Sequence, residues 1–152
     1  MKKKYEINNL LEDLSYHSDL EILDSLSDRE KFSKDFFDYS PLLIEQFKGC
    51  LADVVVRPNS VEGVLRVAFL CKKYQIPLTL RGSGTGNYGQ SVPLNKGVVM
   101  LMSSLRKIRD YDDKTGEIFV ECGCLLRDID YYLASKGRQL RLSPSTWRSA
   151  SI

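Results

Sequence analysis

The sequence is poor in the residues that hold metal ions. Among its 152 residues there is one histidine, His17, and there are four cysteines. Cys50 and Cys71 lie within apolar stretches. Cys122 and Cys124 form an isolated C-x-C after a predicted strand, where alternation would point both side chains to one face. Zinc sites usually combine four Cys or His ligands at characteristic spacings, so we predict no metal and reduced, buried thiols.

The sequence also lacks a strong net charge and a long apolar run. Its 22 basic and 20 acidic residues leave a net charge of +2, which gives no field able to attract nucleic acid. No apolar stretch approaches the roughly 20 residues that cross a bilayer. Lys2, Lys3 and Lys4 have the charge of a secretion signal, but Glu6 and later polar residues interrupt the apolar segment it needs. We therefore expect a cytoplasmic protein with no nucleic-acid partner and no transmembrane segment.

What the sequence does have is enough apolar residues, 43%, to build the core of one domain. Its first part is polar and helix-prone. Residues 5–14 place apolar side chains on one helical face, and residues 19–23 resemble a second short helix. Ser27 begins an S-x-x-E capping box, which predicts a helix from about Asp28. We expect residues 1–47 to form an N-terminal helical extension that packs on a domain of residues 48–152.

After residue 50 the pattern changes to strand, helix and strand. Residues 53–58 are a β-branched stretch that ends in a proline, which is typical of a strand. Ser60 is a good N-cap for a helix whose apolar spacing continues to Tyr74, and residues 77–81 form the next strand. Two strands joined by one helix predict a parallel βαβ crossover.

The remaining pattern predicts an α+β domain. We expect strands at residues 98–102 and 117–121, separated by a turn at 111–116. A helix over residues 125–136 should end at Gly137, and residues 140–142 could begin a further strand. The fold class is therefore α+β, a βαβ subdomain followed by a mixed sheet with helices.

A glycine-rich loop, Arg81-Gly82-Ser83-Gly84-Thr85-Gly86-Asn87, follows the second strand of the crossover. Glycine lets the backbone adopt positive φ and approach a ligand closely, and consecutive amides can then form a nest for an anion. A pyrophosphate fits such a nest, with Arg81 at the strand end able to add charge-assisted bonds. The alternative is a plain flexible turn, which needs only one or two glycines.

Three better-known phosphate loops do not match. Gly84-Thr85-Gly86-Asn87-Tyr88-Gly89 has the form G-x-G-x-x-G, but a Rossmann loop opens directly into a helix, whereas here the next element is a strand. A P-loop needs Gly-Lys-Ser/Thr at the end of its glycine run, and a kinase loop needs a V-A-I-K strand after it. The sequence lacks both.

The order of these motifs resembles the FAD-binding (PCMH-type) domain of the vanillyl-alcohol oxidase/p-cresol methylhydroxylase family. The resemblance extends from about residue 47 to the end, and within the family it is greatest to the glycolate oxidase flavoprotein subunit and D-lactate dehydrogenase group. Asp38-Tyr39-Ser40 also resembles the lead-in of that group. The matching segments are Val55-Val56-Arg57-Pro58, Pro77 to Gly86, Gly97-Val98-Val99-Met100-Leu101 and Pro144-Ser145-Thr146.

The resemblance implies FAD as cofactor and names the residues that would hold it. The glycine loop would wrap the FAD pyrophosphate, and the later Pro-Ser loop would touch the flavin. The implied set is Arg81, Gly82, Ser83, Gly84, Thr85, Gly86, Asn87, Gln90, Ser91, Val92, Pro144, Ser145, Thr146, Ser149, Ser151 and Ile152. Some members bond the flavin through a histidine at the position of Thr85, so FAD is expected to be non-covalent here.

The chain is shorter than members of that family, which continue with further strands and a substrate domain. We expect it to be the N-terminal part of an FAD-linked oxidase or dehydrogenase of small 2-hydroxy acids, with no catalytic residue assignable in residues 1–152. Two alternatives are a non-catalytic truncated remnant and a split half that needs a partner chain carrying the rest.

Overall fold

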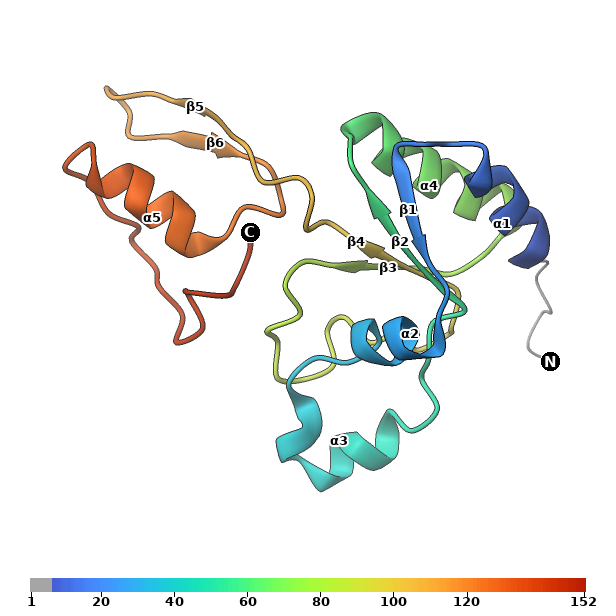
Figure 1. Ribbon diagram of the computed structural model, residues 1–152. Coiled ribbons are helices and arrows are strands. Elements are labelled where there is room, and N and C mark those ends of the chain that lie inside the picture. Colours follow the sequence, from blue (N-terminus) through green and yellow to red (C-terminus); the bar gives the residue numbers. More distant parts are fainter. Residues whose placement is uncertain (1–6) are drawn as a thin grey trace.

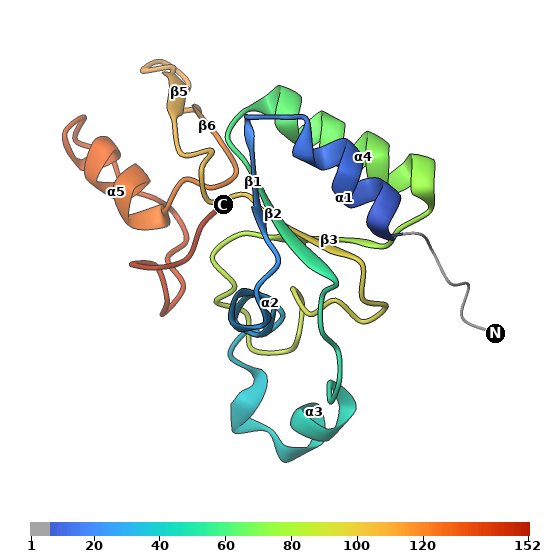
Figure 2. The same ribbon diagram turned by 45° about the vertical axis from the view of Figure 1, so that its right-hand side comes forward.

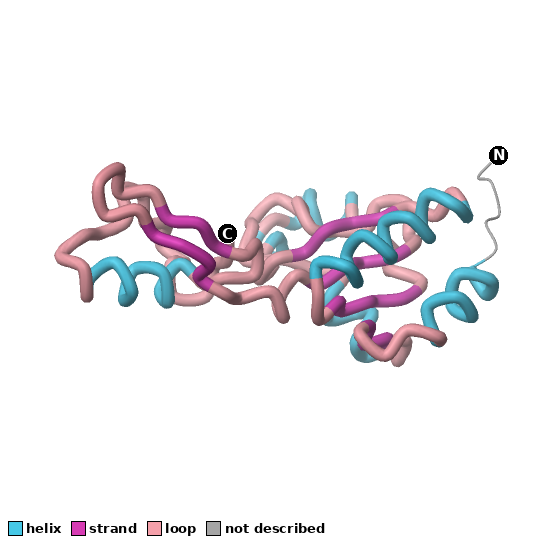
Figure 3. Tube along the Cα trace, turned by 90° about the horizontal axis from the view of Figure 1, so that it is seen from above, coloured by secondary structure: helices cyan, strands magenta, loops and turns pink. Residues whose placement is uncertain are grey.

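A computed structural model describes residues 7–152 and shows two parts side by side (Figures 1 and 3). The larger part is a four-stranded sheet with helices on both faces. The smaller part is a two-stranded hairpin with one helix. Lys2, Lys3 and Lys4 and the start of the helix predicted at residues 5–14 lie outside the described residues. No helix within residues 7–152 is long and apolar enough to span a bilayer.

The large sheet has the strand order β1-β2-β4-β3. Strands β2 (Val54–Pro58), β4 (Val98–Leu101) and β3 (Leu78–Arg81) are parallel, with Val55 paired to Val99 and Val99 paired to Thr79. The helix α4 (Val61–Tyr74) joins β2 to β3, so the predicted crossover is confirmed, and β4 lies between its two strands. The sheet is mixed because β1 joins β2 in the antiparallel direction.

Alternation along the central strands builds two cores. The side chains of Val54 and Val56 on β2 pack with α1 (Ile7–Ser15) and α4 on one face, where Leu10 and Leu14 of α1 are fully buried. Val55 points to the opposite face, where it packs with Phe32 of α2 (Leu26–Phe32). Both faces of these strands are therefore covered (Figure 2), which explains why β2 and β4 are continuous apolar stretches.

The helix predicted at residues 19–23 is wrong. Leu20–Leu23 form the edge strand β1, which pairs with residues 55–58 of β2. So short a segment gains little as an isolated helix, whereas β2 offers an unpaired edge. Helix α2 begins earlier than predicted, because the hydroxyl of Ser25, rather than Ser27, accepts the bond from the Asp28 amide at 3.1 Å. The N-terminal segment is thus partly strand, and its boundary at residue 47 stays a prediction.

Between α2 and β2 the chain forms two short helices, η1 (Phe37–Tyr39) and α3 (Pro41–Gln46). Helix α4 follows the sequence prediction closely. Its N-cap is Ser60, whose hydroxyl accepts the Gly63 amide at 2.9 Å, and it ends at Gln75 in the left-handed conformation.

The smaller part contains β5 (Ile108–Tyr111), β6 (Ile118–Val120) and α5 (Leu126–Ala134). Strand β5 was not predicted, and the possible strand at residues 140–142 does not form. Cys122 and Cys124 were expected on one face of a strand. They lie in a turn instead, with Cys122 exposed and Cys124 buried, because the chain leaves β6 before it reaches them.

Candidate cofactor site

The glycine loop leaves the end of β3 and runs beside the segment that follows α2 before the chain returns to β4 (Figure 1). The Phe36 amide donates to the carbonyl oxygen of Gly86 at 2.8 Å, which fastens the loop to this segment. The next regular element after the loop is a strand, as predicted. The site therefore differs from a Rossmann site, in which a helix N-terminus receives the phosphates.

Arg81 supports the loop from beneath. Its side chain is only 8% exposed, and its Nη1 donates to the carbonyl oxygen of Lys34 and, at 2.9 Å, to the hydroxyl of Ser91. Burial lowers the pKa of Arg81 from its ordinary value, and the charge of Asp35 opposes that shift. The guanidinium thus binds protein groups, and Arg81 does not line the cavity in which we expected it to meet a phosphate.

Gly84 has a φ of +68°, and a Cβ atom on it would lie 2.1 Å from Arg81 Nη2. The loop therefore needs glycine here both for its backbone conformation and for the packing of the guanidinium. A Cβ on Gly86 would lie 2.4 Å from Gln90 Oε1 and 3.2 Å from Asp35 Oδ2. The glycines make room for the polar side chains that surround the loop.

A cavity of about 240 Å³ opens over the glycine loop. Its lining brings together many of the residues predicted for the cofactor: Gly82, Ser83, Gly84, Thr85, Gly86, Gln90, Ser91, Ser151 and Ile152. The Ser83 amide donates to Ser151 Oγ at 3.1 Å, so the end of the described chain lies against the loop. Ile152 is 57% exposed and forms part of the cavity wall.

Other predicted residues do not line this cavity. Val92 is buried in the interior, and Asn87 is exposed beyond the cavity. Pro144, Ser145, Thr146 and Ser149 belong to a turn below α5, in which the Ser149 amide donates to the Thr146 carbonyl at 2.9 Å. Their contact with a cofactor stays a prediction.

Two lining residues, Asp35 and Leu80, were missed by the sequence analysis. Asp35 is 5% exposed, and among the described residues neither of its carboxylate oxygens has a hydrogen-bond partner. It lies far from the glycine loop in the sequence, so no spacing connects the two. The surrounding residues, Ser33, Lys34 and Phe36, give no sign in the sequence that Asp35 is buried.

The loop itself offers free donors. The backbone N–H groups of Gly84, Thr85 and Gly86 donate to no described residue. Successive unpaired amides next to a cavity can bind an anion, because each N–H gains a partner when the anion binds. The geometry therefore fits a pyrophosphate held by backbone amides rather than by side-chain charge.

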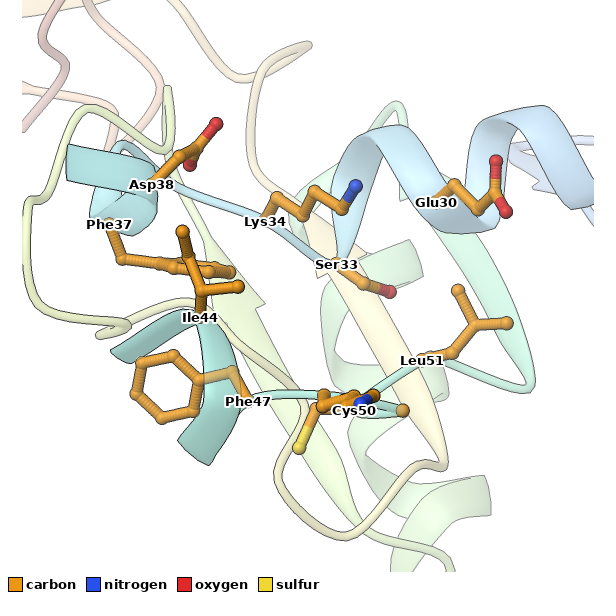
Figure 4. A pocket seen from close by; sticks show the side chains of 11 residues that line it. Glu30, Ser33, Lys34, Phe37, Asp38, Ile44, Phe47, Cys50 and Leu51 are labelled. Carbon is orange, nitrogen blue, oxygen red and sulfur yellow. The ribbon is translucent and has the colours of Figure 1, made fainter. Parts of the chain in front are cut away.

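A second cavity, of about 450 Å³, lies on the other side of the segment after α2. Figure 4 shows Phe37, Ile44 and Phe47 of η1 and the α3 region on one side of it and Glu30 of α2 on the other. The rings of Phe37 and Phe47 meet edge to face with centroids 5.0 Å apart. None of the predicted cofactor residues lines this cavity.

Comparisons with known proteins show the family of the chain. A family described as "FAD binding domain" matches residues 52–152. The glycolate oxidase subunit GlcD of Escherichia coli is 37% identical over 99 residues, which are 65% of this chain and 20% of that protein. The D-lactate dehydrogenase of Anaerostipes hadrus is 34% identical over 77 residues, 51% of this chain and 16% of that protein.

Solved structures show the same fold. The 4-ethylphenol oxidase of Gulosibacter chungangensis aligns with a TM-score of 0.76 at 20% identity, covering 95% of this chain and 27% of that one. p-Cresol methylhydroxylase aligns with a TM-score of 0.73 at 17% identity, covering 94% and 27%. The predicted PCMH-type fold is thus confirmed. The chain spans about a fifth of the length of its curated relatives, from 16% to 24% in the first three.

Proposed function

The chain belongs to the FAD binding domain family, and on this premise we propose that it holds FAD non-covalently as part of an FAD-linked oxidoreductase of small 2-hydroxy acids. The observation that supports this most is the set of unpaired loop amides at Gly84, Thr85 and Gly86 beside a cavity. When bound, FAD supplies the electron acceptor for substrate oxidation.

The residues present fit the pyrophosphate part of FAD. Backbone amides would bind the phosphate oxygens, while Arg81 stabilises the loop and supplies positive charge from below. Ser83 and Ser151 hold the cavity wall together. The loop contains no histidine, and Thr85 takes the place where a covalent link would form in some relatives, which favours reversible binding.

The substrate class comes from the relatives, which are described as glycolate, D-lactate and D-2-hydroxyglutarate enzymes. We propose that acid–base groups for the reaction lie outside residues 1–152. A partner chain or further domain would then cover the exposed wall of the site. Ile152, an apolar side chain that lines the cavity and is 57% exposed, supports this part of the proposal. We also propose a cytoplasmic location. Some relatives are described as mitochondrial, so cell fractionation is needed to test this location.

Titration of the full chain with FAD tests the proposal. We expect two-dimensional NMR to show selective shifts of the Gly84, Thr85 and Gly86 amide signals, a readout that also detects weak binding. Gly84→Val should remove these shifts, because its branched side chain displaces the loop. Uniformly absent or non-saturating shifts in the unmodified chain would contradict FAD binding at this loop.

A further inference from the structure

Asp35 combines features that the fold by itself leaves unexplained. It is 5% exposed, it lines the cavity over the glycine loop, and its two carboxylate oxygens have no hydrogen-bond partner among the described residues. A buried carboxylate without hydrogen-bond donors is costly, and such groups are usually paired. A ligand that brings donors to Asp35 would remove this cost.

The position of Asp35 is fixed by its neighbours. The carbonyl oxygen of Lys34 accepts from Arg81, and the Phe36 amide donates to Gly86 at 2.8 Å, so the residues on both sides are bound to the loop region. The Oδ2 atom lies 3.2 Å from the position that a Cβ on Gly86 would occupy. Asp35 therefore belongs to the Gly86 end of the cavity, next to the free amides.

We propose that Asp35 is a specificity residue that accepts hydrogen bonds from sugar hydroxyls of a dinucleotide whose pyrophosphate rests on the loop amides. The proposal rests on FAD binding at this loop, as inferred above. Hydroxyls are the donors that flank a pyrophosphate, on the ribose of the adenosine half and on the ribityl chain of the flavin half. A carboxylate repels phosphate, so the part of the ligand that suits Asp35 is an uncharged hydrogen-bond donor.

Two neighbours make this role feasible. The charge of Arg81 offsets that of Asp35 in the buried environment. Gln90 is an exposed residue. Like Asp35, it lies next to the position that a Cβ on Gly86 would occupy, with its Oε1 atom 2.4 Å from that position. Its Oε1 accepts the Tyr88 amide at 3.1 Å, and we infer that a ligand displaces Gln90 to reach the carboxylate, whose oxygens are shielded from solvent in the free chain.

The test compares ligands with and without hydroxyls on the full chain. The probes are inorganic pyrophosphate, ADP, 2′,3′-dideoxy-ADP, FMN, and a flavin phosphate whose pentyl chain carries no hydroxyls, each titrated by NMR. We expect at least one hydroxylated ligand to bind about 10- to 100-fold more tightly than its deoxy counterpart, as for a hydrogen bond to a charged group. The pair that shows the preference identifies ribose or ribityl as the source.

Asp35→Asn should weaken this preference, because a neutral amide oxygen accepts a hydrogen bond less strongly than a carboxylate. Pyrophosphate should bind equally well or more tightly, because one negative charge is removed. A purely structural role would weaken all ligands by the same factor. Asp38→Asn is the matched control, an exposed aspartate three residues away, and should keep the preference. The ligand comparison on the unmodified chain needs no variant to fold.

Two results overturn the proposal. The first is equal binding of both members of each ligand pair by the unmodified chain, and the second is a preference that Asp35→Asn leaves undiminished. If pyrophosphate still shifts the loop amides, FAD binding at the loop stands and only the role of Asp35 is wrong. If none of the probes nor FAD binds, the proposed function itself fails, and the role of Asp35 with it.

Discussion

Substitution of Gly84 by alanine tests how much the packing of the Arg81 guanidinium against Gly84 contributes to the free energy of unfolding. The new Cβ would lie 2.1 Å from Nη2 and 2.2 Å from Cζ of Arg81, so the guanidinium must move away from Lys34 and Ser91. Loss of these charge-assisted bonds should cost about 2–4 kcal/mol. Positive φ adds roughly 1–2 kcal/mol for a residue with a Cβ. The total, about 3–6 kcal/mol, is a large part of the 5–15 kcal/mol that typically stabilises a domain.

Gly137→Ala provides the matched control. Gly137 has the same φ of +68°, but a Cβ there would meet nothing within 4 Å. The Gly137→Ala variant should therefore lose only the roughly 1–2 kcal/mol of unfolding free energy that positive φ costs a residue with a Cβ. Urea unfolding followed by circular dichroism measures the free energy of unfolding of both variants. We expect Gly84→Ala to be less stable than Gly137→Ala by about 2–4 kcal/mol.

A double-mutant cycle sharpens the test. Arg81→Ala already removes the bonds to Lys34 and Ser91, so adding Gly84→Ala should then cost only the backbone term. The two effects should be non-additive by about 2–4 kcal/mol. Equal stability of Gly84→Ala and Gly137→Ala, or additive effects in the cycle, would show that the position of the Arg81 guanidinium does not depend on the absence of a Cβ at residue 84.

Three further predictions follow from the site and the core. FAD bound to the chain should be released completely by acid precipitation, since Thr85 provides no covalent link; yellow colour in the washed pellet would contradict this. Burial raises the pKa of the Cys71 thiol from an ordinary 9.0 to about 11, so the folded state favours the neutral thiol. The contribution of the buried Cys71 thiol to the free energy of unfolding is complete below pH 9 and is lost as the pH rises toward 11. The unmodified chain should therefore lose about 3 kcal/mol more than Cys71→Ala across that range in urea unfolding, whereas parallel curves would refute the assignment. The isolated chain should not reduce dye acceptors with D-lactate or glycolate; saturable, substrate-dependent reduction above that of free FAD would show that residues 1–152 contain a complete site.

Local patterns predicted the central elements well. The β-branched stretch before Pro58, the Ser60 cap and the apolar spacing of α4 are confirmed, because each depends on neighbours within a few residues. The glycine loop was found for the same reason, because its many glycines indicate a backbone that adopts positive φ angles. The failure at residues 20–23 has a different cause, since only the free edge of β2 turns that segment into a strand.

The composition of the site was predicted only in part. Residues contiguous with the loop, such as Ser83 and Thr85, line the cavity as expected. Asp35 was missed because it reaches Gly86 through a tertiary contact between segments that no sequence period connects. Arg81 was assigned to a phosphate from its charge, its place at the end of the strand and the family resemblance, whereas in the structure its side chain is held by Lys34 and Ser91.

The sequence by itself thus determined the βαβ crossover, the phosphate-type loop and the absence of a metal-binding pattern, since these follow from spacing and residue type. Only the tertiary structure decided which segment pairs with β2, where the guanidinium of Arg81 lies, and that Ser151 and Asp35 meet the loop from its two sides. The physical reason is that such contacts join distant segments, and their energies depend on burial and geometry that exist only once the chain has packed.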